Sequence, residues 1–295
     1  MTIFKGSATA LVTPFSESGT EINFDALKDL IDFQISNGTK ALIVLGTTGE
    51  ASTITLEERI KIIECAVSHT NRRVPVIAGA GSNDTMVAVN NSKIYESLGV
   101  DGLLIVTPYY NKCTQKGLIE HYTKISDNVN LPIILYNVPG RTGVNILPST
   151  VKELSKIKNI TAIKGASGNL EQVSEIARIC GDDIDIYCGD DALILPVLSV
   201  GGKGVISVAS NVVPDLVNKL CESFFEGEIE ESRQYQFLLN PLIKALFLEV
   251  NPIPVKTALN LMNKKAGGLR LPLTSMETEN IEILKSEMIK LELIK

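Results

Sequence analysis

Histidine and tryptophan are scarce in this chain of 295 residues, which has two histidines and no tryptophan. Neither His69 nor His121 lies at a metal-ligand spacing from the other or from a cysteine. We therefore expect no structural or catalytic zinc and no metal cofactor. The same shortage disfavours a metal-dependent, class II aldolase.

Cysteine is sparse, odd in number and unpatterned. The chain contains no Cys-x-x-Cys pair, and its five cysteines are Cys65, Cys113, Cys180, Cys188 and Cys221. An odd set without paired spacing favours free thiols in a reducing compartment over a disulfide framework.

Long apolar runs and an excess of positive charge are also missing. No segment approaches the roughly 18 apolar residues of a membrane span, and the N-terminal apolar stretch is broken at Pro14 without a convincing cleavage site. We expect a cytoplasmic protein with no membrane partner. The formal net charge is -6 and no basic stripe is visible, so we expect no nucleic-acid partner.

Short apolar, β-branched runs are present, and there are eight of them. Their apolar character is nearly continuous, as in parallel strands that are buried on both faces. Eight is the number that a closed barrel needs. The predicted strands are Ser7–Thr13, Ala41–Leu45, Val74–Ala78, Gly102–Val106, Pro132–Tyr136, Ile160–Ile163, Asp185–Tyr187 and Gly204–Val208.

Helical signals separate these runs. Apolar residues recur at three- and four-residue spacing from Asn23 to Phe33, and Thr55 with Glu58 forms a capping box before the next helix. Further helix starts are expected at Asn83 or Asp84, Thr114, Pro148 and Asn169. A strand and a helix thus alternate about every 25 to 35 residues, which predicts an α/β fold, a (β/α)8 TIM barrel.

The end of the chain differs from the rest. After about Pro214 it shows helical patterns only, so we expect a catalytic barrel domain over residues 1–220 and a C-terminal helical appendage over residues 221–295. A doubly wound open sheet is the competing fold. It would require a phosphate-binding turn after the first strand, and residues 7–15 offer none.

Lys164 closes the apolar run Ile160–Ile163 and is followed by Gly165-Ala-Ser167. Burial favours the neutral amine of a lysine, and a neutral amine is the nucleophile of Schiff-base chemistry. From this residue alone the alternative stays open that the stem packs while the head reaches solvent.

Other polar residues follow neighbouring strands. The turn Gly46-Thr-Thr-Gly-Glu50 can present backbone N–H groups and hydroxyls to a small anion, because its flanking glycines permit backbone geometry that other residues resist. Alternatively, the turn simply joins strand to helix. Tyr136 ends its strand next to that of Lys164 and can shuttle protons or merely plug the barrel. Arg141 can clamp a carboxylate. The combination at one rim favours a catalytic site.

Four blocks of sequence resemble one enzyme family. Gly46-Thr-Thr-Gly-Glu, Tyr109-Tyr110, Tyr136-Asn-Val-Pro-x-Arg141-Thr-Gly and Lys164-x-Ala-Ser occur in the order, and on the strands, of dihydrodipicolinate synthases. This family belongs to the pyruvate-dependent class I aldolases, which include N-acetylneuraminate lyase. The resemblance covers essentially the whole chain.

The resemblance implies a reaction and its catalytic residues. Lys164 would condense with pyruvate to an imine, whose enamine attacks aspartate semialdehyde in the diaminopimelate route of lysine biosynthesis. Tyr136, Thr47 and Tyr110 would form a proton relay, with Tyr110 supplied by a neighbouring subunit. No cofactor is implied, and the family assembly is a homotetramer of tight dimers.

The resemblance also implies substrate-binding residues. Thr48, with Thr47, would hold the pyruvate carboxylate, and Arg141 the carboxylate of the semialdehyde. Gly189 and Ile206 match positions whose backbone lies near the substrate and the lysine. Sugar-acid lyases of the superfamily generally lack the arginine, so an N-acetylneuraminate lyase or a 2-keto-3-deoxy sugar acid aldolase is the alternative. A catalytically silent binding protein is a third reading.

One departure from the family concerns feedback by lysine. Inhibited members carry a serine, a histidine and a glutamate where this chain has Ala51, Arg59 and Val87, whereas Asn83 and Tyr109 are retained. An effector's α-amino group then loses its partners, so weak or absent inhibition is expected.

Overall fold

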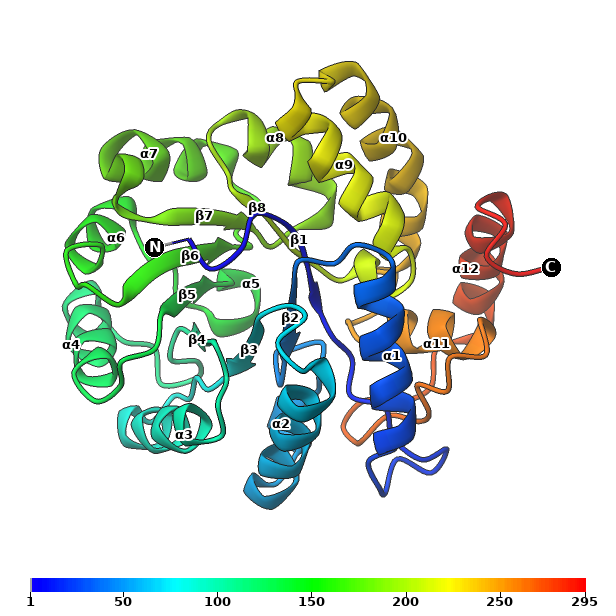
Figure 1. Ribbon diagram of the computed structural model, residues 1–295, viewed down its shortest axis with the longest axis horizontal. Helices are drawn as coiled ribbons and strands as arrows, with labels where there is room; N and C mark the ends of the chain where they lie inside the picture. The colour runs from blue at the N-terminus through cyan, green and yellow to red at the C-terminus, as the bar shows by residue number, and fades with distance from the viewer. Residues whose placement is uncertain (1) are drawn as a thin grey trace.

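The computed structural model describes residues 2–295, and eight parallel strands in it form a closed barrel (Figure 1). Each strand pairs with the next along the chain, and β8 returns to pair with β1. The TIM-barrel prediction is therefore confirmed. The strands are β1 Gly6–Ala10, β2 Ala41–Val44, β3 Val76–Gly79, β4 Gly102–Val106, β5 Ile133–Asn137, β6 Ile160–Gly165, β7 Asp185–Cys188 and β8 Gly204–Ser207.

Predicted and observed strand bounds agree within two residues except at the end of β1. That strand was expected to reach Thr13 but ends at Ala10. The Leu11 N–H still bonds to the strand β2 carbonyl of Ile43, but the Val12 N–H donates instead to the side chain of Asn211. A side chain thus replaces the neighbouring strand as the hydrogen-bond partner.

Helices alternate with the strands around the barrel, as Figure 1 shows. They are α1 Phe24–Ser36, α2 Leu56–Thr70, α3 Thr85–Ser97, α4 Gln115–Ser126, α5 Pro139–Thr142, α6 Pro148–Leu154, α7 Leu170–Cys180, α8 Ile194–Ser199 and α9 Pro214–Glu226. Short 3₁₀ turns lie at η1 Ala51–Thr53, η2 Gly181–Asp183, η3 Asp191–Leu193 and η4 Ala209–Asn211.

The predicted helix starts are confirmed, by capping hydrogen bonds at four of them and by the first residue of α6 at Pro148, which has no side-chain cap. Thr55 and Glu58 form the expected capping box at the start of α2. Asp84, Thr114 and Asn169 each accept a backbone N–H at the start of α3, α4 and α7. Local sequence therefore determines where these helices begin, because the cap satisfies N–H groups that have no partner within the helix.

The interior of the barrel is filled by side chains. Phe4 stacks on Tyr187 with ring centroids 4.1 Å apart. The same inner layer of apolar side chains includes Ile77, Leu104 and Ile206. A second and larger apolar layer separates the strands from the helices. A filled interior leaves the carboxyl ends of the strands as the end at which a site can form.

The C-terminal tail, defined here as residues 229–295, carries α10 Ile229–Ala245, α11 Ile253–Leu261 and α12 Thr278–Lys290. Helix α10 packs on α9 and α12 (Figure 1). The helical appendage is thus confirmed, while the expected boundary at residue 220 stays a prediction. Within residues 2–295 the model has no helix with the length and apolarity of a membrane span. All five cysteines are free.

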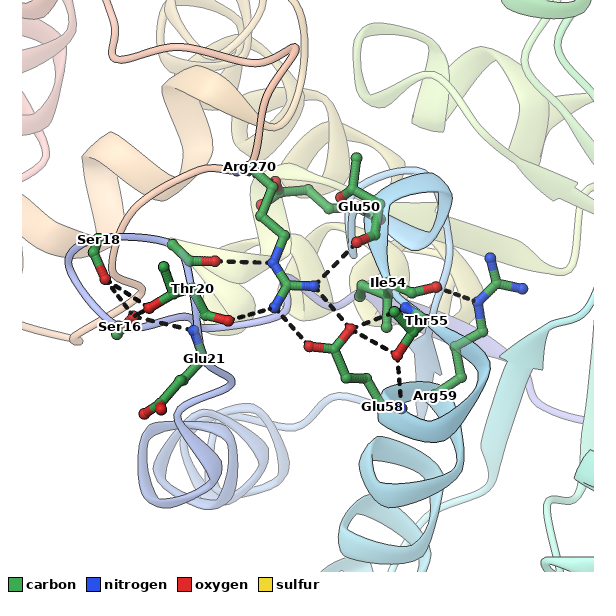
Figure 2. A network of polar contacts seen from close by, with 12 residues as sticks. Ser16, Ser18, Thr20, Glu21, Glu50, Ile54, Thr55, Glu58, Arg59 and Arg270 are labelled. Atoms are coloured by element: carbon green, nitrogen blue, oxygen red, sulfur yellow. Dashed lines mark hydrogen bonds and ion pairs between the residues drawn. The ribbon is translucent and has the colours of Figure 1, made fainter.

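Arg270 ties this tail to the barrel (Figure 2). Its guanidinium lies 2.7 and 2.9 Å from the two carboxylate oxygens of Glu58 on α2. It also donates to the carbonyls of Gly19, Thr20 and Thr53. This guanidinium lowers the pKa of the Glu58 carboxyl to about 2. The carboxylate is therefore bound more strongly as an anion than it is in the unfolded chain.

Replacing Glu58 by Gln is expected to lower the free energy of unfolding at pH 7 by about 2 kcal/mol, allowing for solvent around a side chain that is 24% exposed. Because the folded pKa is depressed, this stabilisation is present above pH about 4.5 and is lost as the pH falls to about 2. Urea unfolding of both chains across this range measures the effect.

The matched control is Glu57→Gln on the same helix, where the carboxylate pairs with Lys61 in solvent. This exposed pair is expected to leave stability unchanged. Equal stability of the Glu58→Gln variant and the parent at pH 7 would contradict the role assigned to Arg270.

Candidate active site

A cavity of about 530 Å³ lies at the carboxyl ends of the strands. Six of the eight residues expected from the sequence line it, namely Thr47, Thr48, Tyr136, Arg141, Lys164 and Gly189. Besides the amine of Lys164, two of its lining side chains are cationic, Arg141 and Lys244, against one carboxylate, Asp190. This excess of positive charge suits anionic ligands.

Lys164 lies on β6, directly beside Tyr136 on β5. The two residues are register partners, and the Lys164 Nζ atom lies 4.4 Å from the centroid of the phenol ring. Lys164 is 5% exposed and Tyr136 is 7% exposed. The barrel therefore holds an amine and a phenol together at the floor of the cavity, largely shielded from bulk water.

A second buried lysine, Lys256 on α11, has the surroundings of a structural residue and can be compared with Lys164. Its Nζ atom lies 2.8 Å from Glu50 Oε1 and also donates to the carbonyls of Thr13 and Gly268. Both members of the pair are 1% exposed. Lys164 has no carboxylate partner of this kind among residues 2–295. Its amine is left available to a ligand.

The Gly46–Glu50 turn differs in one respect from the expectation. Positive φ angles occur not at Gly46 and Gly49 but at the residues next to them. Leu45, before the first glycine, has a φ of 55°, and Glu50, after the second, has a φ of 54°. Gly49 is required for space instead, since a Cβ there would lie 3.2 Å from the Leu11 carbonyl oxygen and the Leu45 nitrogen. Unfavourable backbone geometry at two larger residues is typical of functional sites.

The two threonines of this turn have free backbone donors. Neither the Thr47 nor the Thr48 N–H has an acceptor within the part of the chain that the structure describes. The Gly49 and Glu50 N–H groups, by contrast, close the turn onto the carbonyls of Gly46 and Thr47. Two adjacent free N–H groups beside a lysine can bind a small carboxylate.

The turn is held in place by the C-terminal tail, which the sequence analysis did not anticipate. Glu50 accepts hydrogen bonds from Lys256 on one oxygen and from the Arg270 backbone N–H on the other. The Thr13 hydroxyl donates to the Gly49 carbonyl at 2.7 Å. A lysine within the largely apolar segment Ile253–Leu261 was the signal that could have suggested a buried partner.

Arg141 lies on the short helix α5 at the cavity. Its Nη2 atom donates to the backbone carbonyl of Asn251 at 3.0 Å. The tail contributes further lining that sequence reasoning missed, from Asn240, Ile243, Lys244, Phe247 and Asn251. No local pattern could reveal these residues, because they follow all eight strands in the chain and reach the cavity only through tertiary packing.

Gly189 lies against the lysine, as the resemblance implied. A Cβ at this position would lie 3.0 Å from Lys164 Cε and 2.8 Å from the Ala166 Cβ, so a side chain would displace the lysine. Asp191, two residues on, is buried and accepts the N–H groups of Val208 and Ala209. Burial raises the pKa of the Asp191 carboxyl. These two hydrogen bonds hold the ends of β7 and β8 together.

The remaining two expected residues lie elsewhere. Ile206 is buried in the inner layer of the barrel with Tyr136 and does not line the cavity. Tyr110 is 91% exposed, has a φ of 70°, and also lies outside the cavity of its own chain. A smaller cavity of about 290 Å³ adjoins the first, and its walls include Thr47, Tyr136 and Tyr109.

Comparison with known proteins agrees with this geometry. The model of the dihydrodipicolinate synthetase family matches residues 3–290. The chain is 53% identical over 295 residues to 4-hydroxy-tetrahydrodipicolinate synthase 1 of Clostridium acetobutylicum, covering 100% of both chains. It is 56% identical over 289 residues to the Caldicellulosiruptor saccharolyticus synthase, covering 98% of this chain and 97% of the relative.

Solved structures show the same likeness. The dihydrodipicolinate synthase of Thermotoga maritima superposes with a TM-score of 0.97 at 43% identity, covering 99% of this chain and 100% of the other. The family model, the full-length relatives and this solved structure all agree with the resemblance of the four sequence blocks. The chain belongs to the dihydrodipicolinate synthetase family.

Proposed function

We propose that this chain condenses pyruvate with L-aspartate 4-semialdehyde, as a 4-hydroxy-tetrahydrodipicolinate synthase of lysine biosynthesis. Family membership makes it an enzyme, a lyase with a class I aldolase type of mechanism. The observation that carries the proposal is the buried Lys164 amine, which has no carboxylate partner within residues 2–295 and faces the cavity beside the phenol of Tyr136.

The reaction begins at Lys164. Its neutral amine attacks the keto carbon of pyruvate, and loss of water leaves a protonated imine. Loss of a proton from the methyl group gives an enamine, whose carbon attacks the aldehyde while the aldehyde oxygen takes up a proton. The α-amino group of the semialdehyde then attacks the imine carbon, which closes the ring and releases Lys164. Tyr136, whose ring centroid lies 4.4 Å from the Lys164 Nζ atom, is the phenol that we assign to carry these protons.

Two carboxylate sites orient the substrates. The free N–H groups of Thr47 and Thr48 hold the carboxylate of pyruvate next to Lys164. Arg141 holds the carboxylate of the semialdehyde, because a guanidinium pairs with a carboxylate through two parallel hydrogen bonds. Gly189 leaves room for the lysine and its imine. Ile206 supports the floor from behind Tyr136.

Tyr110 completes the proton relay from a second copy of the chain. Tyr110 is exposed and has an unfavourable backbone conformation, which is typical of residues at functional sites. The cavity beside Thr47 and Tyr136 offers a phenol of another copy a place next to both. A homotetramer built from tight dimers provides this exchange, and five free thiols suit a cytoplasmic location.

Borohydride reduction in the presence of pyruvate is expected to add one reduced pyruvate to Lys164, detected by peptide mass spectrometry. The Lys164→Ala variant is expected to lose the adduct and at least about 10³-fold in kcat, because the covalent route is gone. Lys152→Met, at a surface lysine that pairs with Asp183, controls for loss of a lysine away from the cavity and should retain the adduct. A Lys164→Ala chain that condenses the two substrates as fast as the parent would rule out the mechanism, and a parent without adduct would indicate a silent binding protein.

Substrate choice is tested by pairing pyruvate with either aspartate semialdehyde or N-acetylmannosamine. Turnover is expected with the semialdehyde only. The Arg141→Met variant should have a KM for the semialdehyde that is about 10- to 100-fold higher, which corresponds to the free energy of a charge-assisted hydrogen-bonded pair. Arg233→Met on the exposed face of α10 is the control and should change nothing. Faster turnover of the amino sugar would instead identify a sugar-acid lyase.

Lysine is expected to inhibit the enzyme weakly or not at all. Arg59, which lines the smaller cavity, donates to the carbonyls of Ala51 and Ile54 and puts a cation where an effector's ammonium would lie. Val87 offers no carboxylate to that ammonium. Initial rates measured against lysine concentration test this, and half-maximal inhibition at micromolar lysine would contradict it.

A further inference from the structure

Asn251 joins the two carboxylate sites of the cavity. Its side-chain Nδ2 atom lies 2.9 Å from the Thr48 hydroxyl oxygen, and its backbone carbonyl accepts from Arg141 at 3.0 Å. All three residues line the same cavity. Asn251 is 5% exposed and Thr48 is 2% exposed, so water does not compete freely for these bonds.

The contact with Thr48 determines where its hydroxyl proton can go. A hydroxyl group has one proton to donate and two lone pairs that accept. The Asn251 N–H occupies a lone pair of the Thr48 oxygen, and no other side chain or carbonyl in residues 2–295 bonds to that hydroxyl. Its proton is therefore left for an acceptor within the cavity, and a substrate carboxylate is such an acceptor.

The position of Asn251 depends on how the tail, to which it belongs, packs against the barrel. Asn251 lies two residues before the start of α11, whose Lys256 is bonded to Glu50 at the other end of the same turn. The tail thus holds the turn at Thr48 and at Glu50. The Asn251 Oδ1 atom is buried and has no partner among the described residues, so the side chain is not satisfied as a purely structural amide.

We propose that Asn251 is a positioning residue that aims the Thr48 hydroxyl proton at the carboxylate of pyruvate and holds Arg141 at the cavity. This inference rests on the proposed function, in which Thr48 binds pyruvate. Asn251 itself takes no part in imine formation. Its loss should weaken pyruvate binding more than it slows the reaction of bound pyruvate.

Steady-state kinetics separate these effects. Asn251→Ala is expected to raise the KM for pyruvate about tenfold, with kcat at saturating pyruvate changed less than about threefold. Asn251→Asp should raise this KM further, since a carboxylate accepts the Thr48 proton and repels the substrate. Asn260→Ala is the matched control. It removes another tail asparagine with two hydrogen bonds, both to Gly267, and should leave the KM unchanged.

A double-mutant cycle tests whether Asn251 acts through Thr48. In a Thr48→Val background, Asn251→Ala is expected to cause little further change in the KM for pyruvate, because there is no hydroxyl left to orient. Additive effects would overturn the proposal, as would a KM within twofold of the parent for Asn251→Asp. If Asn251→Ala does not fold, as judged by circular dichroism, Asn251→Ser replaces it and is read by the same criteria.

Failure of this proposal can be distinguished from failure of the proposed function. A parent chain that traps no pyruvate with borohydride would overturn the function itself. A parent that traps pyruvate normally, with Asn251 variants that bind it equally well, would overturn only the role of Asn251.

Discussion

Closure of the parallel barrel is the constraint on which the rest of the structure depends. Since β8 pairs with β1, all eight strands end at one rim, and residues far apart in sequence meet there. The ladder between β5 and β6 sets Tyr136 opposite Lys164 in register. Because successive side chains in a strand alternate faces, a slip of one residue in that ladder would turn one of the pair away from the cavity. The pairing of this amine with this phenol is thus a property of the sheet.

The two buried lysines show how environment decides what a residue does. Lys256 has an ion pair with Glu50 and two carbonyl acceptors, so its charge is compensated and it serves the structure. Lys164 faces a cavity beside a phenol without such a partner. The same side chain therefore anchors the tail in one place and offers a nucleophile in the other.

The tail lines the candidate site and also packs against the barrel. Through Glu50, Lys256 and Arg270 it stabilises a turn whose flanking residues, Leu45 and Glu50, have unfavourable backbone conformations. A turn with free N–H groups is unfavourable by itself, because backbone N–H groups in folded proteins normally have hydrogen-bond acceptors. Contacts from outside the barrel compensate for it, and the site and the tail consequently depend on each other.

The sequence by itself determined the barrel, the helix starts and the groups at the strand ends, because these follow from local apolar patterns and capping residues such as Thr55 and Asp84. Family resemblance added roles for them. Only the tertiary structure decided that Lys256 supports the Glu50 turn and that Asn251 reaches Thr48, more than 200 residues away. Contacts between such distant segments leave no periodic signal in the chain, since they depend on how the tail packs against the closed barrel.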